Sequence, residues 1–218
     1  MKKQTIIAIA LFLLLTTITS REKLEISKFN IQKIIIENNF LLNEKEIKKL
    51  LTPIYDKNIF FVGNSTIANV LMQNDFIESY NIKKKYPHTL KIKIFEKKPI
   101  AILIDKKNKF YLSDKVDLIT FKKIKEYQNL PYVFGKKKNF EILYNDLKKN
   151  DFPFNIIKKY TFFETNRWDV ETTDDNLIKL SSKDYVKNLN NYLDLIKKNN
   201  FKKYKTFDYR IDNQLILK

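Results

Sequence analysis

Residue types that carry out chemistry are scarce in this chain. It has a single histidine, no cysteine and two glycines, Gly63 and Gly135, among 218 residues. Without cysteine it can form no disulfide, no thiol nucleophile and no thiolate-bound zinc or iron–sulfur site. One histidine cannot supply an H-E-x-x-H zinc motif, and two isolated glycines cannot build a phosphate-binding loop. We therefore expect no enzyme, and no catalytic residue, metal ligand or cofactor.

The positive charge of the chain comes almost entirely from lysine. The formal net charge is +17, and of 42 basic residues only Arg21, Arg167 and Arg210 are arginines. Nucleic-acid surfaces usually depend on arginine, whose planar guanidinium binds phosphates and bases through paired hydrogen bonds. The composition therefore favours solvated lysines, and no nucleic-acid partner is expected.

Arg167 and Arg210 are conspicuous in a chain that otherwise uses lysine, since arginine alone offers a planar, two-pronged donor. One interpretation is an ion pair within the protein, with Asp208 or Glu171 as the partner. The other is a bidentate contact with a carboxylate of a binding partner. The sequence leaves both interpretations open.

The N-terminal residues predict a membrane-directing segment. Met1-Lys2-Lys3 precedes an uncharged run over residues 4–20, which spans roughly 25 Å as a helix. An uncleaved signal anchor and a cleaved signal peptide are both possible, and the lack of a good A-x-A site favours the anchor. The charge step predicts a type II protein with a cytoplasmic tail at 1–3, a transmembrane anchor at 4–20, a linker at 21–28 and an exported body.

The next stretch predicts a mixed domain in the order strand, helix, helix, strand, strand. A first helix is expected after an N-cap at Asn43, which has a glutamate three residues on. A second helix is expected after a cap at Ser65. The predicted strands are residues 29–36, 77–85 and 90–95.

The remaining stretch predicts a mainly antiparallel β domain with one late helix. Ser181-Ser182-Lys183-Asp184 matches a capping box, and apolar residues follow it at helical spacing. The fold class is therefore α+β, with an N-terminal anchor helix. The predicted strands are residues 100–104, 109–112, 156–163, 168–171, 177–180, 207–211 and 214–217.

Four stretches in this order resemble the FtsQ/DivIB family of bacterial division proteins. The first is the exported anchor followed by the strand–helix–helix–strand–strand unit, which looks like a POTRA domain. The second, residues 86–101 (YPHTLKIKIFEKKPIA), is similar to the family's P-x-T-L-x-I-x-I-x-E-[RK]-x-P-x-A junction. The third, residues 130–135 (LPYVFG), resembles an L-P-x-[IVL]-x-G turn. The fourth is Arg167-Trp168-Asp169-Val170 with Phe207-Asp208-Tyr209-Arg210, similar to the R-W-x-[LV] and D-x-R elements.

The resemblance implies a POTRA domain at 29–96 and an FtsQ-type β domain at 97–218. It also implies a non-enzymatic scaffold of the divisome, in the inner membrane at the division septum, with its body in the periplasm. Implied partners are FtsB-like and FtsL-like division proteins, and through them the septal peptidoglycan synthase complex. Two alternatives remain: a cleaved periplasmic envelope-binding protein, and a POTRA component of a transport system.

The last strand pair is the predicted partner-binding edge. Residues 214–217 contain no charge and no proline, which usually protect an exposed edge strand. An extended partner segment could add a strand there through main-chain hydrogen bonds. The predicted partner-binding residues are Arg167, Tyr209, Arg210, Ile211, Gln214, Leu215, Ile216 and Leu217.

Overall fold

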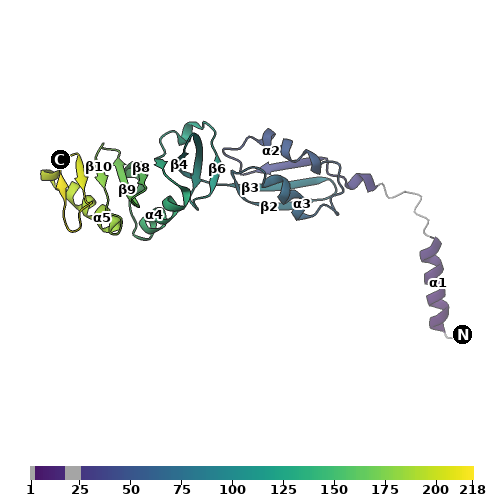
Figure 1. The fold of residues 1–218 in the computed structure, drawn as a ribbon. Helices are drawn as coiled ribbons and strands as arrows, with labels where there is room; N and C mark the ends of the chain where they lie inside the picture. The colour runs from purple at the N-terminus through teal and green to yellow at the C-terminus, as the bar shows by residue number, and fades with distance from the viewer. Residues whose placement is uncertain (1–2, 18–25) are drawn as a thin grey trace. The chain divides into compact units, whose positions relative to one another are not determined.

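The computed structural model describes residues 3–17 and 26–218 (Figure 1). Its contacts divide the chain into two compact units, one of Met1–Gln73 with Ser79–Phe95 and one of Asn74–Glu78 with Glu96–Lys218. The first helix, α1 (Lys3–Thr17), is wholly apolar from Ile6 to Leu15. No helix in the described ranges reaches the length and hydropathy needed to cross a membrane. The predicted anchor at 4–20 coincides with α1 as far as Thr17, and its last three residues lie outside the described part.

The first unit carries a three-stranded sheet with two short helices, in the order predicted. The sheet order is β1-β3-β2, and β1 runs parallel to β3. The first strand is shorter than the predicted 29–36, because residues 26–29 form a 3₁₀ turn. The elements are η1 (Ile26–Phe29), β1 (Lys33–Glu37), α2 (Glu44–Leu50), η2 (Thr52–Ile54), α3 (Asn64–Leu71), β2 (Ile77–Lys85) and β3 (Thr89–Glu96).

The two helix starts of this unit differ from each other. At α2 the cap is the predicted one: the side-chain oxygen of Asn43 accepts from the Lys45 N–H at 2.9 Å. Such a cap contributes about 1 kcal/mol. The prediction of Ser65 as the second cap is wrong, because α3 begins after Gly63, in extended backbone and without a side-chain cap bond.

The core of the first unit is built from the apolar face of each element. Alternate residues of β1 and β3 and the inward stripe of each helix are buried, as periods of two and of three to four residues require. Fully or nearly fully buried are Ile34 and Ile36 from β1, Ile47 from α2, Ile67 and Leu71 from α3, and Leu90, Ile92 and Ile94 from β3.

The second unit is a nine-stranded sheet in the order β12-β11-β10-β9-β8-β7-β4-β5-β6. The prediction of a mainly antiparallel domain needs correction, because the sheet is mixed: β4–β7, β7–β8 and β10–β11 are parallel pairs. The strands are β4 (Pro99–Asp105), β5 (Asn108–Ser113), β6 (Leu118–Thr120), β7 (Tyr132–Phe134), β8 (Ile157–Phe163), β9 (Arg167–Thr172), β10 (Leu177–Lys179), β11 (Thr206–Asp208) and β12 (Ile216–Leu217).

Two helices make two of the three parallel connections. The helix α4 (Lys137–Lys149) joins β7 to β8, and α5 (Tyr185–Ile196) joins β10 to β11. The sequence reasoning missed α4. It placed a capping box at 181–184, whereas α5 begins only after Asp184, which makes no side-chain cap bond. The Ser181 hydroxyl does accept from the Asp184 N–H at 3.2 Å, so the expected bond forms without a helix around it.

Gly135, the residue directly after β7, meets a strict packing requirement. Its φ is +154°, and a Cβ placed on it would lie 2.8 Å from the Cβ of Phe162. Phe162 in turn contacts Trp168, a buried residue of β9, with ring centroids 4.9 Å apart. The absence of a side chain at Gly135 therefore lets β7 end against the aromatic core.

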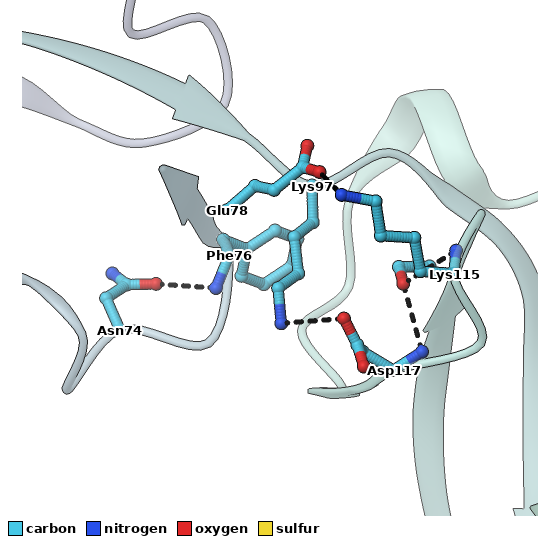
Figure 2. A network of polar contacts seen from close by, with 7 residues as sticks. Asn74, Phe76, Glu78, Lys97, Lys115 and Asp117 are labelled. Atoms are coloured by element: carbon cyan, nitrogen blue, oxygen red, sulfur yellow. Dashed lines mark hydrogen bonds and ion pairs between the residues drawn. The ribbon is translucent and has the colours of Figure 1, made fainter. Parts of the chain in front are cut away.

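A short segment that ends in the first two residues of β2, Asn74–Glu78, packs within the second unit. Figure 2 shows Lys97 beside Asp117, with Nζ and carboxylate 3.4 Å apart, and Lys115 paired with Glu78. The Phe76 ring lies 6.2 Å from that of Tyr111, a buried residue of β5. The aromatic contact of Phe76, the ion pair of Glu78 and the hydrogen bond from the Lys97 N–H to the Phe76 carbonyl, at 2.7 Å, explain why Asn74–Glu78 belongs to the second unit.

Candidate functional site

The strand β12 forms one edge of the nine-stranded sheet. Lys218 and Thr206 exchange two main-chain hydrogen bonds, with N···O distances of 3.1 and 3.0 Å. In an antiparallel pair such residues alternate with pairs that exchange no bonds. Leu217, opposite Phe207, is therefore at a position where its N–H and C=O face away from β11. These two groups are available to a further strand.

The side chains of this edge divide between the core and the solvent. Leu215 and Leu217 pack partly buried against the hydrophobic core of the unit. Ile216 lies on the other face and is 40% exposed. No lysine, glutamate or proline lies among residues 214–217, so the edge lacks the usual protection against strand pairing.

Arg210 is held in a fixed orientation by Asp208. The guanidinium Nε donates to Oδ1 at 2.8 Å, and Nη2 donates to Oδ2 at 2.6 Å. This hydrogen bonding lowers the pKa of the Asp208 carboxyl and raises that of Arg210. The intramolecular ion pair considered from the sequence is therefore present. The Arg210 side chain is still 43% exposed, whereas that of Asp208 is buried.

Arg167 makes no such pair. Its guanidinium lies over the Phe163 ring, 4.5 Å from the centroid, in a cation–π contact. Neither Asp208 nor Glu171 forms an ion pair with it in the described part of the chain. Its Nε is buried and has no hydrogen-bond partner there. The two arginines thus lie in different environments, one paired and one stacked.

Sequence reasoning missed two charged residues between these arginines. Asp169 of β9 pairs in register with Lys179 of β10, and Lys179 with Asp208 of β11. Burial raises the pKa of Asp169, opposed by the nearby charges of Arg167 and Lys179. The alternation along Arg167-Trp168-Asp169 was the available signal, since residues two apart share a face of the sheet. Asp169, Lys179 and Asp208 therefore form a charged row across β9, β10 and β11, and Ile216 of β12 is the next residue in register.

A small cavity adjoins the edge. Its volume is about 360 Å³, and it lies between the start of α5 and the loop before β12. The Tyr209 hydroxyl donates to the Asn191 side chain at 2.9 Å, and burial raises the pKa of Tyr209. Four predicted site residues line this cavity: Tyr209, Ile211, Gln214 and Leu215. The structure therefore brings the C-terminal site residues together, with Arg210 beside them and Arg167 two strands further along the sheet.

A larger cavity of about 690 Å³ opens beside α4. Its wall is mainly apolar and aromatic, with Tyr132, Phe140, Tyr144, Phe154 and Tyr160 among its residues. Within residues 3–17 and 26–218, no group of three or more histidine, cysteine, aspartate or glutamate side chains could hold a metal ion.

Comparisons with known proteins point to one kind of relative. Residues 29–97 match the family model described as "POTRA domain, FtsQ-type". Cell division protein FtsQ from Rickettsia bellii is 29% identical over 191 residues, which cover 85% of this chain and 71% of the relative. The protein of the same name from Rickettsia typhi is 28% identical over the same shares.

More distant matches carry related names. Cell division protein DivIB from Clostridium tetani is 27% identical over 57% of this chain and 43% of its own. A solved structure of the major extracytoplasmic domain of DivIB from Geobacillus stearothermophilus, in its trans isomer, covers 45% of this chain and 89% of that chain. It matches at 15% identity with a TM-score of 0.34, a likeness too low to support a conclusion.

Proposed function

Because this chain belongs to the FtsQ/DivIB family of non-enzymatic cell division proteins, with an FtsQ-type POTRA domain at residues 29–97, we propose that it is a membrane-anchored scaffold of the division complex. In this proposal α1 is part of a single-pass type II anchor in the inner membrane. The body lies in the periplasm at the septum. There it binds FtsB-like and FtsL-like division proteins and helps control the septal peptidoglycan synthase complex.

The observation that carries the proposal is the unprotected edge at β12. A buried or partnered edge needs no protection, but an exposed edge without it pairs readily with other strands. Here Leu217 presents its main-chain groups outward and Ile216 is exposed beside them. An extended partner segment would extend the sheet by one strand, with main-chain bonds giving affinity and side-chain pockets giving specificity.

The charged row supports a partner with acidic side chains. In the ion pair next to the edge, the arginine side chain is exposed and the aspartate side chain is buried, so the charge presented to solvent there is positive. Asp208 orients the Arg210 guanidinium while leaving much of it exposed, so a partner carboxylate would meet a preoriented donor. In this proposal Arg167 provides a second contact, at the far side of the row, for the same partner segment.

A pair of isoleucines allows a matched test of the edge. Ile216 on β12 is 40% exposed and Ile142 on α4 is 54% exposed, both within the second unit. The full chain with Ile216→Lys is expected to lose co-purification with FtsB-like and FtsL-like partners, because a lysine protects an edge strand. The full chain with Ile142→Lys should keep it. Equal retention of partners by both variants would place the interface elsewhere.

The anchor has a test of its own. We expect the mature protein to begin at Met1 and to resist extraction from membranes by salt and alkali. Mass spectrometry of the purified N-terminus reads the first point, and fractionation reads the second. A mature protein that begins near Arg21 and is released by salt would instead support the cleaved, envelope-binding alternative.

A further inference from the structure

Three loops of the first unit bring three aromatic side chains into contact, and a fourth, highly exposed aromatic residue is their neighbour in the sequence. Phe29 ends η1, Phe60 and Phe61 follow η2, and Tyr86 lies in the turn between β2 and β3. The ring centroids of Phe29 and Phe60 are 5.0 Å apart, and those of Phe60 and Tyr86 are 4.8 Å apart in a stacked arrangement. We refer to these four residues as the aromatic patch.

Main-chain bonds fix the three loops to one another. The Ile59 N–H donates to the Phe29 carbonyl at 2.8 Å, and the Ile31 N–H donates to the Lys57 carbonyl at 2.9 Å. The Gln32 N–H donates to the His88 carbonyl at 3.0 Å, which connects the third loop. The patch is therefore a built surface of the fold rather than a chance grouping of mobile loop residues.

The patch exposes far more aromatic area than folding requires. Phe61 is 85% exposed, Tyr86 57% and Phe60 52%. Such exposed apolar clusters mark interaction sites on soluble domains. The core of the first unit does not depend on these exposed rings, because neighbouring residues such as Ile31 and Ile59 are already fully buried in it.

A concentration of lysines surrounds the patch. The loops and the end of β2 contain Lys28, Lys57, Lys83, Lys84 and Lys85, whereas Asp56 is the one acidic residue within 27–33, 56–62 and 82–88. Lys84 is fixed in place, with Nζ donating to the Val62 carbonyl at 2.8 Å. Aromatic rings bordered by lysines are typical of surfaces that lie in the headgroup region of an anionic bilayer.

The position of the patch along the chain also matches a bilayer. Only 12 peptide units separate Thr17, the last residue of α1, from Phe29. A fully extended chain of that length reaches about 40 Å. If α1 lies in the membrane, as proposed above, the patch is tethered near the bilayer surface, at a high effective concentration relative to the lipid headgroups.

From this geometry we propose that the aromatic patch, with its surrounding lysines, binds the surface of an anionic lipid bilayer and holds the first unit against the membrane. The proposal rests on the proposed membrane anchor. Phe61 and Tyr86 would enter the headgroup region, where aromatic side chains are favoured, while the lysines contact anionic headgroups.

The chain contains no cysteine, so one introduced thiol can be labelled uniquely. The test reconstitutes the full chain with Phe61→Cys or, as a matched control, Met72→Cys, each carrying an environment-sensitive fluorophore. Met72 is also exposed but precedes β2, whereas the patch residue Tyr86 follows the end of that nine-residue strand. Vesicles of phosphatidylcholine with and without phosphatidylglycerol are compared, with spin-labelled lipid as quencher.

We expect lipid quenching and a blue-shifted emission at position 61 in phosphatidylglycerol vesicles, and neither at position 72. Replacing Lys28, Lys57 and Lys85 by glutamine should weaken this contact by about fivefold per lysine, or roughly a hundredfold in all. A label at 61 that stays as water-exposed as the label at 72 would overturn the proposal. So would shielding that arises only when a second protein is added.

Flotation of the same vesicles separates this inference from the anchor. Co-flotation with an unquenched label at position 61 would refute the patch alone. Failure to co-float with any vesicle would refute the anchor, and the patch proposal with it. Circular dichroism of each variant confirms that the fold is retained, as expected for substitutions at exposed positions.

Discussion

Leu217 provides the sharpest test of strand addition. Its N–H faces away from β11, because the adjacent Lys218 exchanges its bonds with Thr206. Proline at an edge strand is tolerated where its missing N–H would have faced solvent. Leu217→Pro therefore removes one outward donor and keeps the pairing with β11. Leu217→Ala is the control, since both variants lose the same half-buried leucine side chain.

The expected difference between the two variants follows from hydrogen-bond energetics. Both should lose about 1–2 kcal/mol of folding free energy through reduced packing. Only the proline variant leaves a partner carbonyl without its donor, which costs about 1–3 kcal/mol in the complex. Its affinity for an extended FtsB-type peptide should therefore be about five- to a hundredfold lower than that of Leu217→Ala.

Titration of the labelled peptide by fluorescence anisotropy measures this difference, with thermal unfolding as the check on folding. Equal affinities for the proline and alanine variants, both folded, would refute strand addition at β12. Ile216→Pro is a poorer test. Its N–H faces β11 opposite Asp208, so its loss would damage the fold whether or not a partner binds there.

Three further predictions concern the fold. Arg210→Ala should destabilise the protein slightly at pH 7, because it removes the partner of the buried Asp208 carboxylate. Arg210 lowers the folded-state pKa of Asp208, so the difference in stability between the variant and the original chain should shrink as the pH falls below about 4. Thermal melts at a series of pH values measure this difference, and a difference that does not change with pH would contradict the prediction. Gly135→Ala should cost about 1–3 kcal/mol in denaturant unfolding, because the added Cβ would lie 2.8 Å from the Phe162 Cβ; an unchanged midpoint would show that packing at Gly135 is not limiting. Tyr111→Phe removes the hydroxyl bond to the Lys122 carbonyl and should cost about 1 kcal/mol in the same assay, so an unchanged midpoint would show that this bond has no net effect.

Local patterns predicted the first unit well because each element there has a clear period. The strand at 77–85 is found with its predicted bounds, and the helix after Asn43 begins where the cap chemistry places it. The second cap was misplaced because serine and glycine near residue 64 offer similar starts. In the structure α3 starts after Gly63, whose backbone is extended, and no side chain caps the helix.

The second unit was harder to predict because its pairing is not local. Two of the three parallel pairs, β7–β8 and β10–β11, depend on helices that carry the chain back to the end of the sheet where the previous strand began. Phe140, Leu143, Tyr144 and Leu147 have the spacing of a helix, but Lys136 provides no side-chain cap and three lysines open the segment. Without α4, the parallel order of β7 and β8 could not be inferred.

The candidate site was predictable as a segment but not as a surface. An uncharged terminal strand is visible in residues 214–217, and the sequence shows that arginine is rare in this chain. Their different environments were not predictable, since Arg210 is paired within two residues while Arg167 stacks on Phe163 of the neighbouring strand. Asp169 and Lys179 became part of the site only through the register of β9, β10 and β11.

The strand order of the nine-stranded sheet has a consequence for how the chain assembles. After the β4–β5–β6 meander, every later strand from β7 to β12 is added at one growing side, in the order in which the sequence supplies it. A chain that emerges N-terminus first can extend the sheet one strand at a time, with mostly neighbouring contacts. Until β12 is in place, the growing side ends at β11, where the charged pair Asp208–Arg210 disfavours association with other strands. The unprotected edge at β12 therefore forms only after β12 has paired with β11, at the end of sheet assembly.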